Sequence, residues 1–274
     1  MEIRFTKMHG LGNDFIMLED DGITDYTAVA GRLCERNTGI GADGLIIVCK
    51  SEHSDAKMRI INSDGSEAQM CGNGIRCFSK YVYERGIVKK NKFTVETLAG
   101  VMRPELKLEE GKVKSVTVDM GEPSFDAGRL PMKYDGSFIE KSIFAEDREL
   151  CATAVLMGVP HLIVFDEVDK KDIPKYGESL EHNALFPERT NVDFVRVADK
   201  SNIYVTTWER GCGITLACGT GSCASACACM KTGRVNKDEV TVHIALGELN
   251  IRVNNGRVFM TGEACEVFTG TINI

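Results

Sequence analysis

An internal repeat constrains this chain more than any other feature of its sequence. Shifting the 274 residues by 147 places Cys71-Gly72-Asn73-Gly74 on Cys218-Gly219-Thr220-Gly221 without a gap. The same shift aligns flanking residues: Asn62 with Glu209, Gly86 with Gly233, Val88 with Val235, Thr94-Val95 with Thr241-Val242, and Gly100 with Gly247. A single Cys-Gly-x-Gly arises by chance, but two in phase with matching flanks indicate a duplication. We therefore predict two similar halves, roughly 1–117 and 118–274, related by a pseudo-twofold axis.

Each half has the same predicted order of elements. A helix follows each Cys-Gly-x-Gly: in the first, Ile75, Phe78 and Val82 share a face, and in the second the uncharged run 222–230 must be enclosed by protein. The predicted strands are 15–18, 45–48 and 58–61, then 162–165, 192–195 and 203–206, with further strands within 92–101 and 240–253. The pattern predicts an α+β fold with β-strands wrapped around a central α-helix in each domain.

Composition excludes several classes of protein. The net charge is -7 and no run of five or more like charges occurs, so nucleic acid and anionic membrane are poor partners. No apolar stretch approaches the length of a membrane-spanning helix. Residues 1–5 form neither a basic nor an apolar signal region, so we expect no secretory signal. An odd count of 11 cysteines then favours reduced thiols in the cytosol over disulfides.

The two repeated cysteines carry the chemistry. A cysteine at a helix N-terminus has its thiolate stabilised by the helix dipole and by backbone N–H groups without helical partners. The N–H groups that follow, from Gly72, Asn73, Gly219 and Thr220, suit a carboxylate. If the halves face each other, two thiols flank one anion. Removing a proton from one face of a carbon and returning one to the other requires such an acid/base pair, so we predict a racemase or epimerase.

Other cysteine and glycine patterns support weaker alternatives. Cys212, Cys218, Cys223 and Cys227 lie close in sequence, but they lack the paired knuckles of a structural zinc site, so a metal-binding module is a minor alternative. The segment 39–44 matches G-x-G-x-x-G, yet a helix precedes it and a strand follows, the reverse of a dinucleotide site. We expect eight other cysteines to be small buried hydrophobic residues without a chemical role. They are Cys34, Cys49, Cys77, Cys151, Cys223, Cys227, Cys229 and Cys265.

Three polar residues stand beside the repeated motif. His161 closes a Gly-Val-Pro-His turn that follows a strand, and Glu209-Arg210 comes nine residues before Cys218. An acid and a base entering the same loop as a catalytic thiol are better explained as ligand contacts than as a solvated surface.

Five motifs run along nearly the whole chain from Met8 onward. They are Met8-His9-Gly10-Leu11-Gly12-Asn13-Asp14-Phe15, Gly39-Ile40-Gly41-Ala42-Asp43-Gly44, Asn62-Ser63-Asp64-Gly65-Ser66-Glu67, Met70-Cys71-Gly72-Asn73-Gly74, and Trp208-Glu209-Arg210-Gly211 with Ala217-Cys218-Gly219-Thr220-Gly221. In sequence and in order, these motifs resemble those of the diaminopimelate epimerases. Proline racemases share the two-cysteine plan, but the first and third motifs together resemble the epimerase.

The resemblance implies an isomerase that interconverts LL- and meso-2,6-diaminopimelate without pyridoxal phosphate or metal. It also implies a cytoplasmic homodimer serving lysine and peptidoglycan precursor biosynthesis. Cys71 would deprotonate the LL centre and Cys218 would protonate its other face, with the roles exchanged in reverse. The other implied residues are Gly72, Asn73, Gly219 and Thr220 for the reacting carboxylate; Asn13, Asn62, Asn191, Glu209 and Arg210 for the rest of the substrate; and His161 and Glu209 for tuning the thiol pKa values.

The family fold implies that the final strand returns to the first domain. The predicted domains are therefore 1–117 plus 264–274, carrying Cys71, and 118–263, carrying Cys218, with the active site in the cleft between them. Three positions depart from the common family pattern: Val159, Gly44 and Ile214. The first two departures remove polar contacts to the distal end of the substrate, which implies less strict selection of diaminopimelate. A separate alternative keeps the chemistry and takes a smaller amino acid, such as proline or hydroxyproline, as the substrate.

Overall fold

The computed structural model describes residues 2–273 and divides into two compact units. Unit 1 comprises Met1–Asp119 with Thr261–Ile274, and unit 2 comprises Met120–Met260. The C-terminal strand β19 (Cys265–Asn273) belongs to unit 1, where it pairs antiparallel with β1 (Glu2–Gly10). The predicted domain boundaries after residues 117 and 263 remain a prediction, and the units below are those of the structure.

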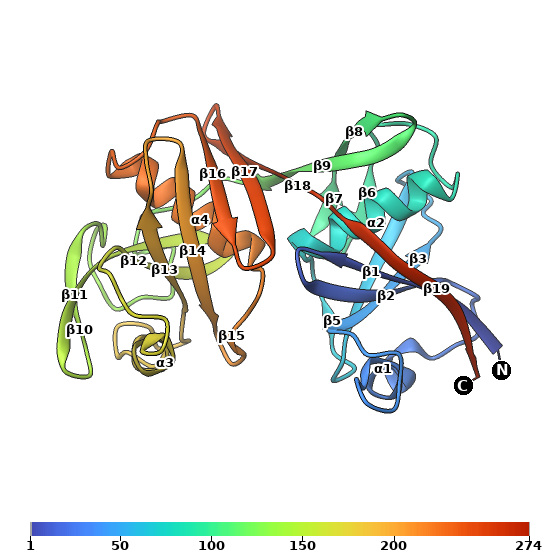
Figure 1. The fold of residues 1–274 in the computed structure, drawn as a ribbon, viewed down its shortest axis with the longest axis horizontal. Helices are drawn as coiled ribbons and strands as arrows, with labels where there is room; N and C mark the ends of the chain where they lie inside the picture. The colour runs from blue at the N-terminus through green and yellow to red at the C-terminus, as the bar shows by residue number, and fades with distance from the viewer. Residues whose placement is uncertain (1, 274) are drawn as a thin grey trace. The chain divides into compact units, whose positions relative to one another are not determined.

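Unit 1 is one mixed sheet with a helix on each face (Figure 1). The strand order is β19-β1-β2-β3-β4-β6-β7, with the short β5 paired to β4. The remaining bounds are β2 (Asn13–Glu19), α1 (Tyr26–Cys34), β3 (Gly44–Cys49), β4 (Ala56–Asn62), β5 (Glu67–Ala68), α2 (Gly72–Glu84), β6 (Val95–Thr97) and β7 (Gly100–Met102).

Strand β3 shows why the helices take opposite faces. Its residues alternate between the two faces of the sheet, and all of 44–48 are buried. Leu45 and Ile47 join the core cluster that contains Ala30 and Leu33 of α1. Ile46 points the other way, close to Gly74 in the first turn of α2. The predicted face of α2 is confirmed, because Ile75, Phe78 and Val82 are fully buried.

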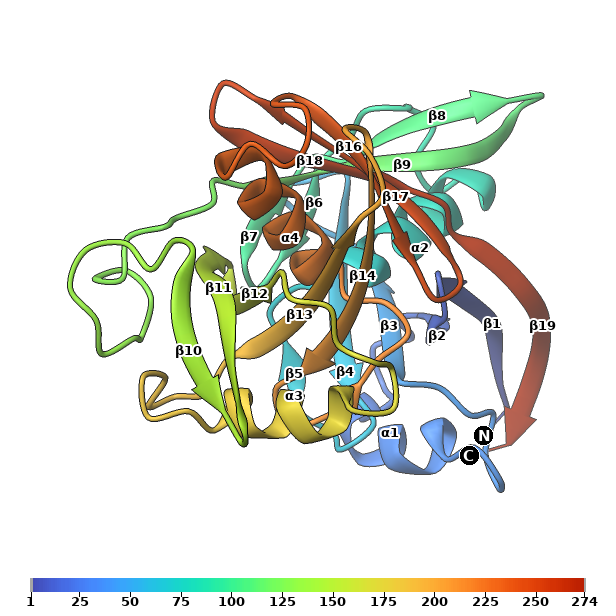
Figure 2. The ribbon, with the colours of Figure 1, turned by 60° about the vertical axis from the view of Figure 1, so that its left-hand side comes forward.

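Unit 2 repeats this arrangement (Figure 2). Its strands follow the order β10-β11-β12-β13-β14-β16-β17-β18, with β15 paired to β14. Strand β8 and most of β9 belong to unit 1, where they form an antiparallel pair. The bounds are β8 (Glu105–Glu109), β9 (Lys112–Gly121), β10 (Lys141–Ala145), β11 (Arg148–Met157), β12 (Val159–Val164), α3 (Ile173–Glu181), β13 (Asn191–Val197), β14 (Asn202–Glu209), β15 (Gly213–Ile214), α4 (Gly219–Lys231), β16 (Glu239–Ile244), β17 (Gly247–Asn254) and β18 (Arg257–Gly262).

The duplication extends to strand register. The shift that carries Cys71 onto Cys218 also carries the 9-residue α1 onto α3 and the 13-residue α2 onto α4. Opposite partners on β3 and β4, Ile46 and Ile60, map onto opposite partners on β13 and β14, Asp193 and Thr207. The predicted α+β class with two pseudosymmetric parts is confirmed.

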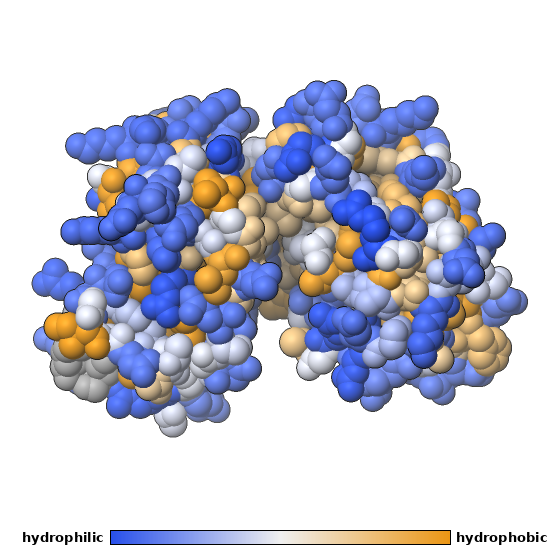
Figure 3. Space-filling model, turned by 180° about the vertical axis from the view of Figure 1, so that it is seen from behind, coloured by the Kyte–Doolittle hydropathy of each residue, from blue (hydrophilic) through white to orange (hydrophobic). Residues whose placement is uncertain are grey.

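On the face of each unit that Figure 3 shows, most exposed residues are polar and the apolar residues lie in small groups. Among residues 2–273, none of the helices combines the length and the apolar character needed to cross a membrane. Helix α4, which contains the uncharged run 222–230, is enclosed as predicted: it packs on β11, β12, β13, β14 and β17, and ten of its residues are buried.

Candidate active site

Both repeated cysteines are the N-caps of their helices. Cys71 precedes α2 with extended backbone, and its Sγ accepts a hydrogen bond from the Gly74 N–H at 3.4 Å. Cys218 precedes α4 in the same way and accepts from the Gly221 N–H at 3.3 Å. The first N–H groups of a helix have no acceptor within the helix, and at both starts the thiol accepts from one of them.

The second glycine of each motif lies against a different environment. A Cβ on Gly74 would meet Ile46 Cδ1 at 3.2 Å, the far end of an apolar side chain. A Cβ on Gly221 would overlap Asp193 Oδ1 and lie 3.0 Å from Thr207 Oγ1. In unit 2 the glycine is therefore required because a buried carboxylate occupies the space beside the helix start.

In unit 1, a tight hairpin places Asn13 next to Cys71. Strands β1 and β2 are joined through Leu11 and Gly12, both with positive φ (60° and 98°), as two-residue hairpins require. The Asn13 Oδ1 accepts from the Cys71 thiol at 3.5 Å and from Asn73 Nδ2 at 3.2 Å. Three of the predicted site residues thus meet at one point.

Charged residues behind this hairpin hold it in place. The Asn13 Nδ2 donates to Asp43 at 2.7 Å, and Arg36 bridges Asp43 and Asp14. Burial raises the pKa of Asp14, but hydrogen bonds from Arg36 and Lys7 outweigh it and lower the pKa to about 2. The glycine-rich segment 39–44 therefore supports the Asn13 hairpin.

Asn62 lies at the end of β4, directly opposite Gly44 of β3. Its Nδ2 donates to Ser66 Oγ at 3.0 Å within the Asn62–Glu67 turn. A Cβ on Gly44 would come within 2.8 Å of the Ile61 carbonyl oxygen, so the backbone here leaves no room for a larger residue. The close approach of the Ile61 carbonyl oxygen thus explains why this chain has glycine at position 44.

In unit 2, Cys218 is buried beside a carboxylate. Its Sγ is 3.4 Å from Thr220 Oγ1, and Glu209 accepts a hydrogen bond from Thr215 Oγ1 at 2.5 Å. Burial raises the pKa of Glu209, while hydrogen bonds from Thr215 and Cys218 oppose the increase. This environment gathers Cys218, Thr220 and Glu209 at the start of α4.

The expected stabilisation of a thiolate at this helix start is outweighed at Cys218. Burial raises its pKa well above the ordinary value, and the charges of Glu209 and Asp193 raise it further. The hydrogen bonds from Thr220 and from the Gly221 N–H lower the pKa but do not compensate. Our expectation of a dipole-stabilised thiolate is wrong here because removal of water and two carboxylates favour the neutral thiol.

His161 lies inside β12, not in a turn after a strand as the sequence suggested. It is fully buried, and its Nδ1 is 2.7 Å from Asp193 Oδ2. The other oxygen of Asp193 accepts from Thr207 Oγ1 at 2.6 Å. We did not identify Asp193 from the sequence, although the repeat offered a signal: a charged residue aligned with Ile46 of an apolar strand.

Asn191 and Arg210 are neighbours at the ends of β13 and β14. The Arg210 N–H donates to Asn191 Oδ1 at 2.8 Å, and Asn191 Nδ2 lies 3.5 Å from His161 Nε2. The exposed guanidinium of Arg210 donates to the Glu188 carbonyl at 2.7 Å. Asn191, Arg210 and His161 are thus brought together, in contact through Asp193 with the start of α4.

A second residue missed from the sequence is Glu181, at the end of α3. Its carboxylate accepts from the Trp208 indole N–H at 2.7 Å and from the Gly211 N–H at 3.0 Å. Trp208 and Gly211 lie on either side of Glu209 and Arg210, so these two bonds hold the loop that carries them. No motif marks Glu181, because its role depends on a contact 27 residues away.

The remaining cysteines divide by burial. Cys34, Cys77, Cys223, Cys227 and Cys229 are buried as expected, and burial raises the pKa of Cys77, Cys227 and Cys229 to about 12, which keeps their thiols neutral. The expectation is wrong for Cys265, which is exposed because β19 is an edge strand, and only in part right for Cys49 and Cys151, which are half-buried.

Two other features bear on ligands. Within residues 2–273, no three His, Cys, Asp or Glu side chains are grouped so as to hold a metal ion, so nothing here favours the metal-binding alternative.

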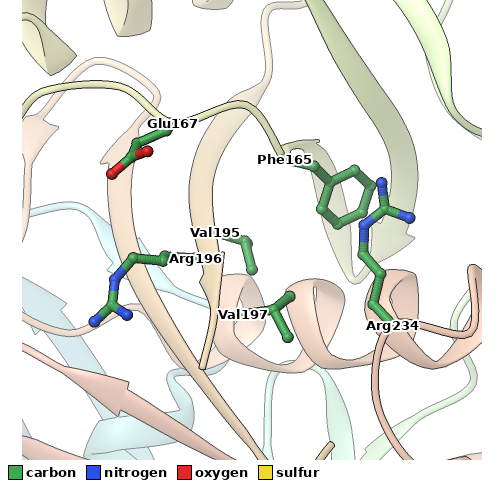
Figure 4. A pocket seen from close by; sticks show the side chains of 6 residues that line it. All are labelled: Phe165, Glu167, Val195, Arg196, Val197 and Arg234. Atoms are coloured by element: carbon green, nitrogen blue, oxygen red, sulfur yellow. The ribbon is translucent and has the colours of Figure 1, made fainter. Parts of the chain in front are cut away.

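A hollow of about 420 Å³ in unit 2 is lined by residues outside the predicted site (Figure 4). These residues are Phe165, Glu167, Val195, Arg196, Val197 and Arg234.

Comparison with known proteins agrees with the fold and the motifs. A family model described as diaminopimelate epimerase matches residues 5–125 and 153–267. A protein named diaminopimelate epimerase from Caldanaerobacter subterraneus subsp. tengcongensis is 50% identical over 275 residues, covering 99% of this chain and 100% of the relative. Both findings span the two units and both Cys-Gly-x-Gly motifs.

Solved structures share the fold at low sequence identity. A PhzF-family phenazine biosynthesis protein from Bacillus anthracis has a TM-score of 0.74 at 15% identity, with 100% of each chain covered. A hydroxyproline epimerase from Agrobacterium vitis, with bound trans-4-hydroxy-L-proline, has a TM-score of 0.70 at 14% identity, covering 99% of this chain and 92% of that one. The family model matches most of the sequence, and a relative covered over its full length is 50% identical. This chain therefore belongs to the diaminopimelate epimerase family.

Proposed function

We propose that this protein interconverts LL- and meso-2,6-diaminopimelate without a cofactor, using Cys71 and Cys218 as paired acid and base. The observation that carries the proposal is that the same thiol-capped helix start occurs at equivalent places in both units. Membership in the diaminopimelate epimerase family supports the choice of substrate.

The reaction needs only proton transfer. The thiolate of Cys71 removes the Cα proton of the LL centre, and the electron pair stays on that carbon and its carboxylate. The thiol of Cys218 then donates its proton to the opposite face, which inverts the centre; the roles exchange in reverse. The N–H groups of Gly72, Asn73, Gly219 and Thr220 would bind the carboxylate and stabilise its developing charge.

The other predicted residues would hold the distal amino acid or adjust the thiols. A guanidinium such as that of Arg210 binds a carboxylate through two parallel hydrogen bonds, and the amides of Asn13, Asn62 and Asn191 can both donate and accept. His161 and Glu209 would tune the thiol pKa values. This assignment requires the domains 1–117 with 264–274 and 118–263 to close on one substrate in the cleft between them.

The central test follows deuterium from solvent into Cα of diaminopimelate by NMR, with no pyridoxal phosphate added. We expect incorporation by the wild type and none by a Cys71→Ala, Cys218→Ala double variant. Exchange retained in the double variant would remove the thiols from the mechanism. Proline and hydroxyproline serve as parallel substrates, and turnover of either one in preference to diaminopimelate would assign the smaller substrate.

A second test addresses the approach of the two thiols to one carbon. Mild peroxide should inactivate the enzyme by coupling Cys71 to Cys218, and a thiol reductant should restore activity. Peptide mass spectrometry identifies the coupled pair. Inactivation without that pair, or without recovery, contradicts the proximity that the reaction needs.

We also propose the setting that the family implies: a cytosolic homodimer that supplies lysine and peptidoglycan precursors. Sedimentation of the purified protein tests the dimer, and a monomeric sedimentation coefficient at assay concentrations would contradict it. Loss of growth without added lysine and diaminopimelate, after deletion of the gene, tests the metabolic role.

A further inference from the structure

Asp193 is a fully buried carboxylate next to the start of α4, and the proposed reaction gives it no role. Its two oxygens have separate partners: Oδ2 lies 2.7 Å from His161 Nδ1, and Oδ1 accepts from Thr207 Oγ1 at 2.6 Å. A buried carboxylate is costly unless such hydrogen bonds satisfy it. The same carboxylate excludes any side chain larger than hydrogen at Gly221, inside the Cys-Gly-x-Gly motif.

Arg210, Asn191, His161 and Asp193 form a row of hydrogen-bonded groups. The groups at its two ends determine which atoms donate and which accept. At one end, the backbone N–H of Arg210 donates to Asn191 Oδ1, which turns the Asn191 amide nitrogen toward His161 Nε2 at 3.5 Å. At the other end, Asp193 Oδ1 accepts from Thr207 Oγ1, and Oδ2 lies 2.7 Å from His161 Nδ1. A carboxylate that accepts at both oxygens requires the hydrogen on His161 Nδ1. Both ends therefore require the same arrangement of the ring: a proton on Nδ1 and an acceptor at Nε2.

We propose that Asp193 is a positioning residue, which holds His161 in the Nδ1–H form with Nε2 as the acceptor next to Asn191. The proposal rests on the proposed function, in which His161 and Asn191 belong to the site. The ionisable groups next to the ring are Asp193 from β13 and Glu209 at the end of β14. Both carboxylates also act on Cys218 at the start of α4. Through His161, Asp193 would link the residues that hold substrate to the thiol that exchanges protons.

Unit 1 lacks this device. The positions equivalent to Asp193 and Thr207 are Ile46 and Ile60, which are apolar and buried. By strand register, the residue that stands for His161 is Phe15: Phe15 pairs with Gly44 as His161 pairs with Asn191. Duplication of the fold alone does not require a carboxylate at this place, which favours a role in the chemistry of unit 2.

The test combines a spectroscopic and a kinetic measurement on the full-length enzyme. Long-range ¹H–¹⁵N correlation spectra distinguish a protonated from an unprotonated ring nitrogen, and among the 5 histidines the His161 signals are those absent from a His161→Gln variant. We expect the wild type to carry the hydrogen on Nδ1. In Asp193→Ala, we expect the Nε2–H form to become populated and kcat to fall at least about tenfold, with KM nearly unchanged.

Asp193→Asn separates position from charge. The Thr207 hydroxyl can rotate to accept from the new amide, which leaves the amide oxygen for His161 Nδ1. This variant should keep the Nδ1–H form and lose less activity than Asp193→Ala. Ser225→Ala is the matched control, because Ser225 is buried in α4 and its Oγ has no hydrogen-bond partner in the described structure; it should change neither measurement.

A wild-type ring protonated on Nε2 overturns the proposal, and that spectrum can be recorded even if Asp193→Ala does not fold. Unchanged kcat or an unchanged ring in Asp193→Ala also overturns it, as does equal loss of kcat in the Asn and Ala variants. If the wild type does not act on diaminopimelate, the proposed function fails, while the ring measurement still decides whether Asp193 positions His161.

Discussion

The two helix starts that carry the repeated cysteines share a backbone and differ in what lies beside it. Both thiols cap their helices and accept from the N–H of the second glycine. Next to Gly74 the sheet presents Ile46 and Phe15, whereas next to Gly221 it presents Asp193 and Thr207. Duplication therefore preserved the scaffold while the side chains beneath each thiol diverged.

This difference separates the two thiols chemically. Cys218 is enclosed with two carboxylates, which favour its neutral form, whereas the nearest polar neighbours of Cys71 include the amide of Asn13. A two-base inversion needs one group that holds a proton and one that lacks it at the same moment. Unequal surroundings for equivalent cysteines provide a physical basis for that division.

The largest effect expected from this comparison is catalytic. Cys71→Ala and Cys218→Ala should each lower kcat by about 10³-fold, since each removes one of two obligatory proton carriers. Steady-state kinetics from both stereoisomers measures this. Near wild-type turnover by either variant would show that the two thiols do not act as a pair.

The second glycines should respond unequally to the same substitution. Gly221→Ala forces a methyl group into the space of Asp193 and should lower the free energy of unfolding by about 3 kcal/mol. Gly74→Ala meets only the end of Ile46 and should cost less than about 1 kcal/mol. Urea denaturation of both variants gives the comparison, and equal losses would mean that Asp193 moves aside at little cost.

Glu181 and its counterpart in the repeat, Cys34, offer a smaller contrast. Glu181→Ala leaves the Trp208 and Gly211 N–H groups unpaired and should cost about 2 kcal/mol, with a higher KM from the displaced Glu209–Arg210 loop. Cys34→Ala removes only a buried sulfur, at about 1 kcal/mol, and should leave KM unchanged. A KM unaffected in Glu181→Ala would show that the loop keeps its place without this residue.

The smallest effect concerns pH. Because burial raises the pKa of Glu209 above its ordinary value of 4.5, its contribution to stability is fully present below that value and is lost as pH rises through the folded-state pKa. As pH rises from acidic to alkaline, the free energy of unfolding of the wild type should therefore fall relative to that of Glu209→Gln. Unfolding measured across pH tests this, with Asn62→Gln, the aligned position of unit 1, as the control without a pH-dependent difference. A stability difference for Glu209→Gln that stays constant with pH would contradict the raised pKa.

The repeat and the hydrophobic periodicity predicted the elements nearest the two cysteines. Both thiol-capped helices and the six inner strands lie where the sequence indicated. The outer strands β1, β10 and β11 were not predicted from the local pattern, and the last strand, β19, was expected only from the family resemblance. The partner of β19 is β1, at the opposite end of the sequence. Edge strands of this kind acquire their structure from pairing rather than from local pattern.

For the site, the sequence by itself determined which thiols are special, because only a duplicated Cys-Gly-x-Gly places a cysteine at two equivalent helix starts. Tertiary structure alone decided their electrostatic surroundings. Asp193 reaches His161 across 32 residues, and Glu181 reaches Trp208 across 27. Hydrogen bonds between neighbouring strands and helices join residues without regard to sequence separation, and burial then amplifies the charges that they bring together. The position of each thiol at a helix start could therefore be predicted from the sequence, whereas the pKa of the thiol depends on the residues that tertiary packing places around it.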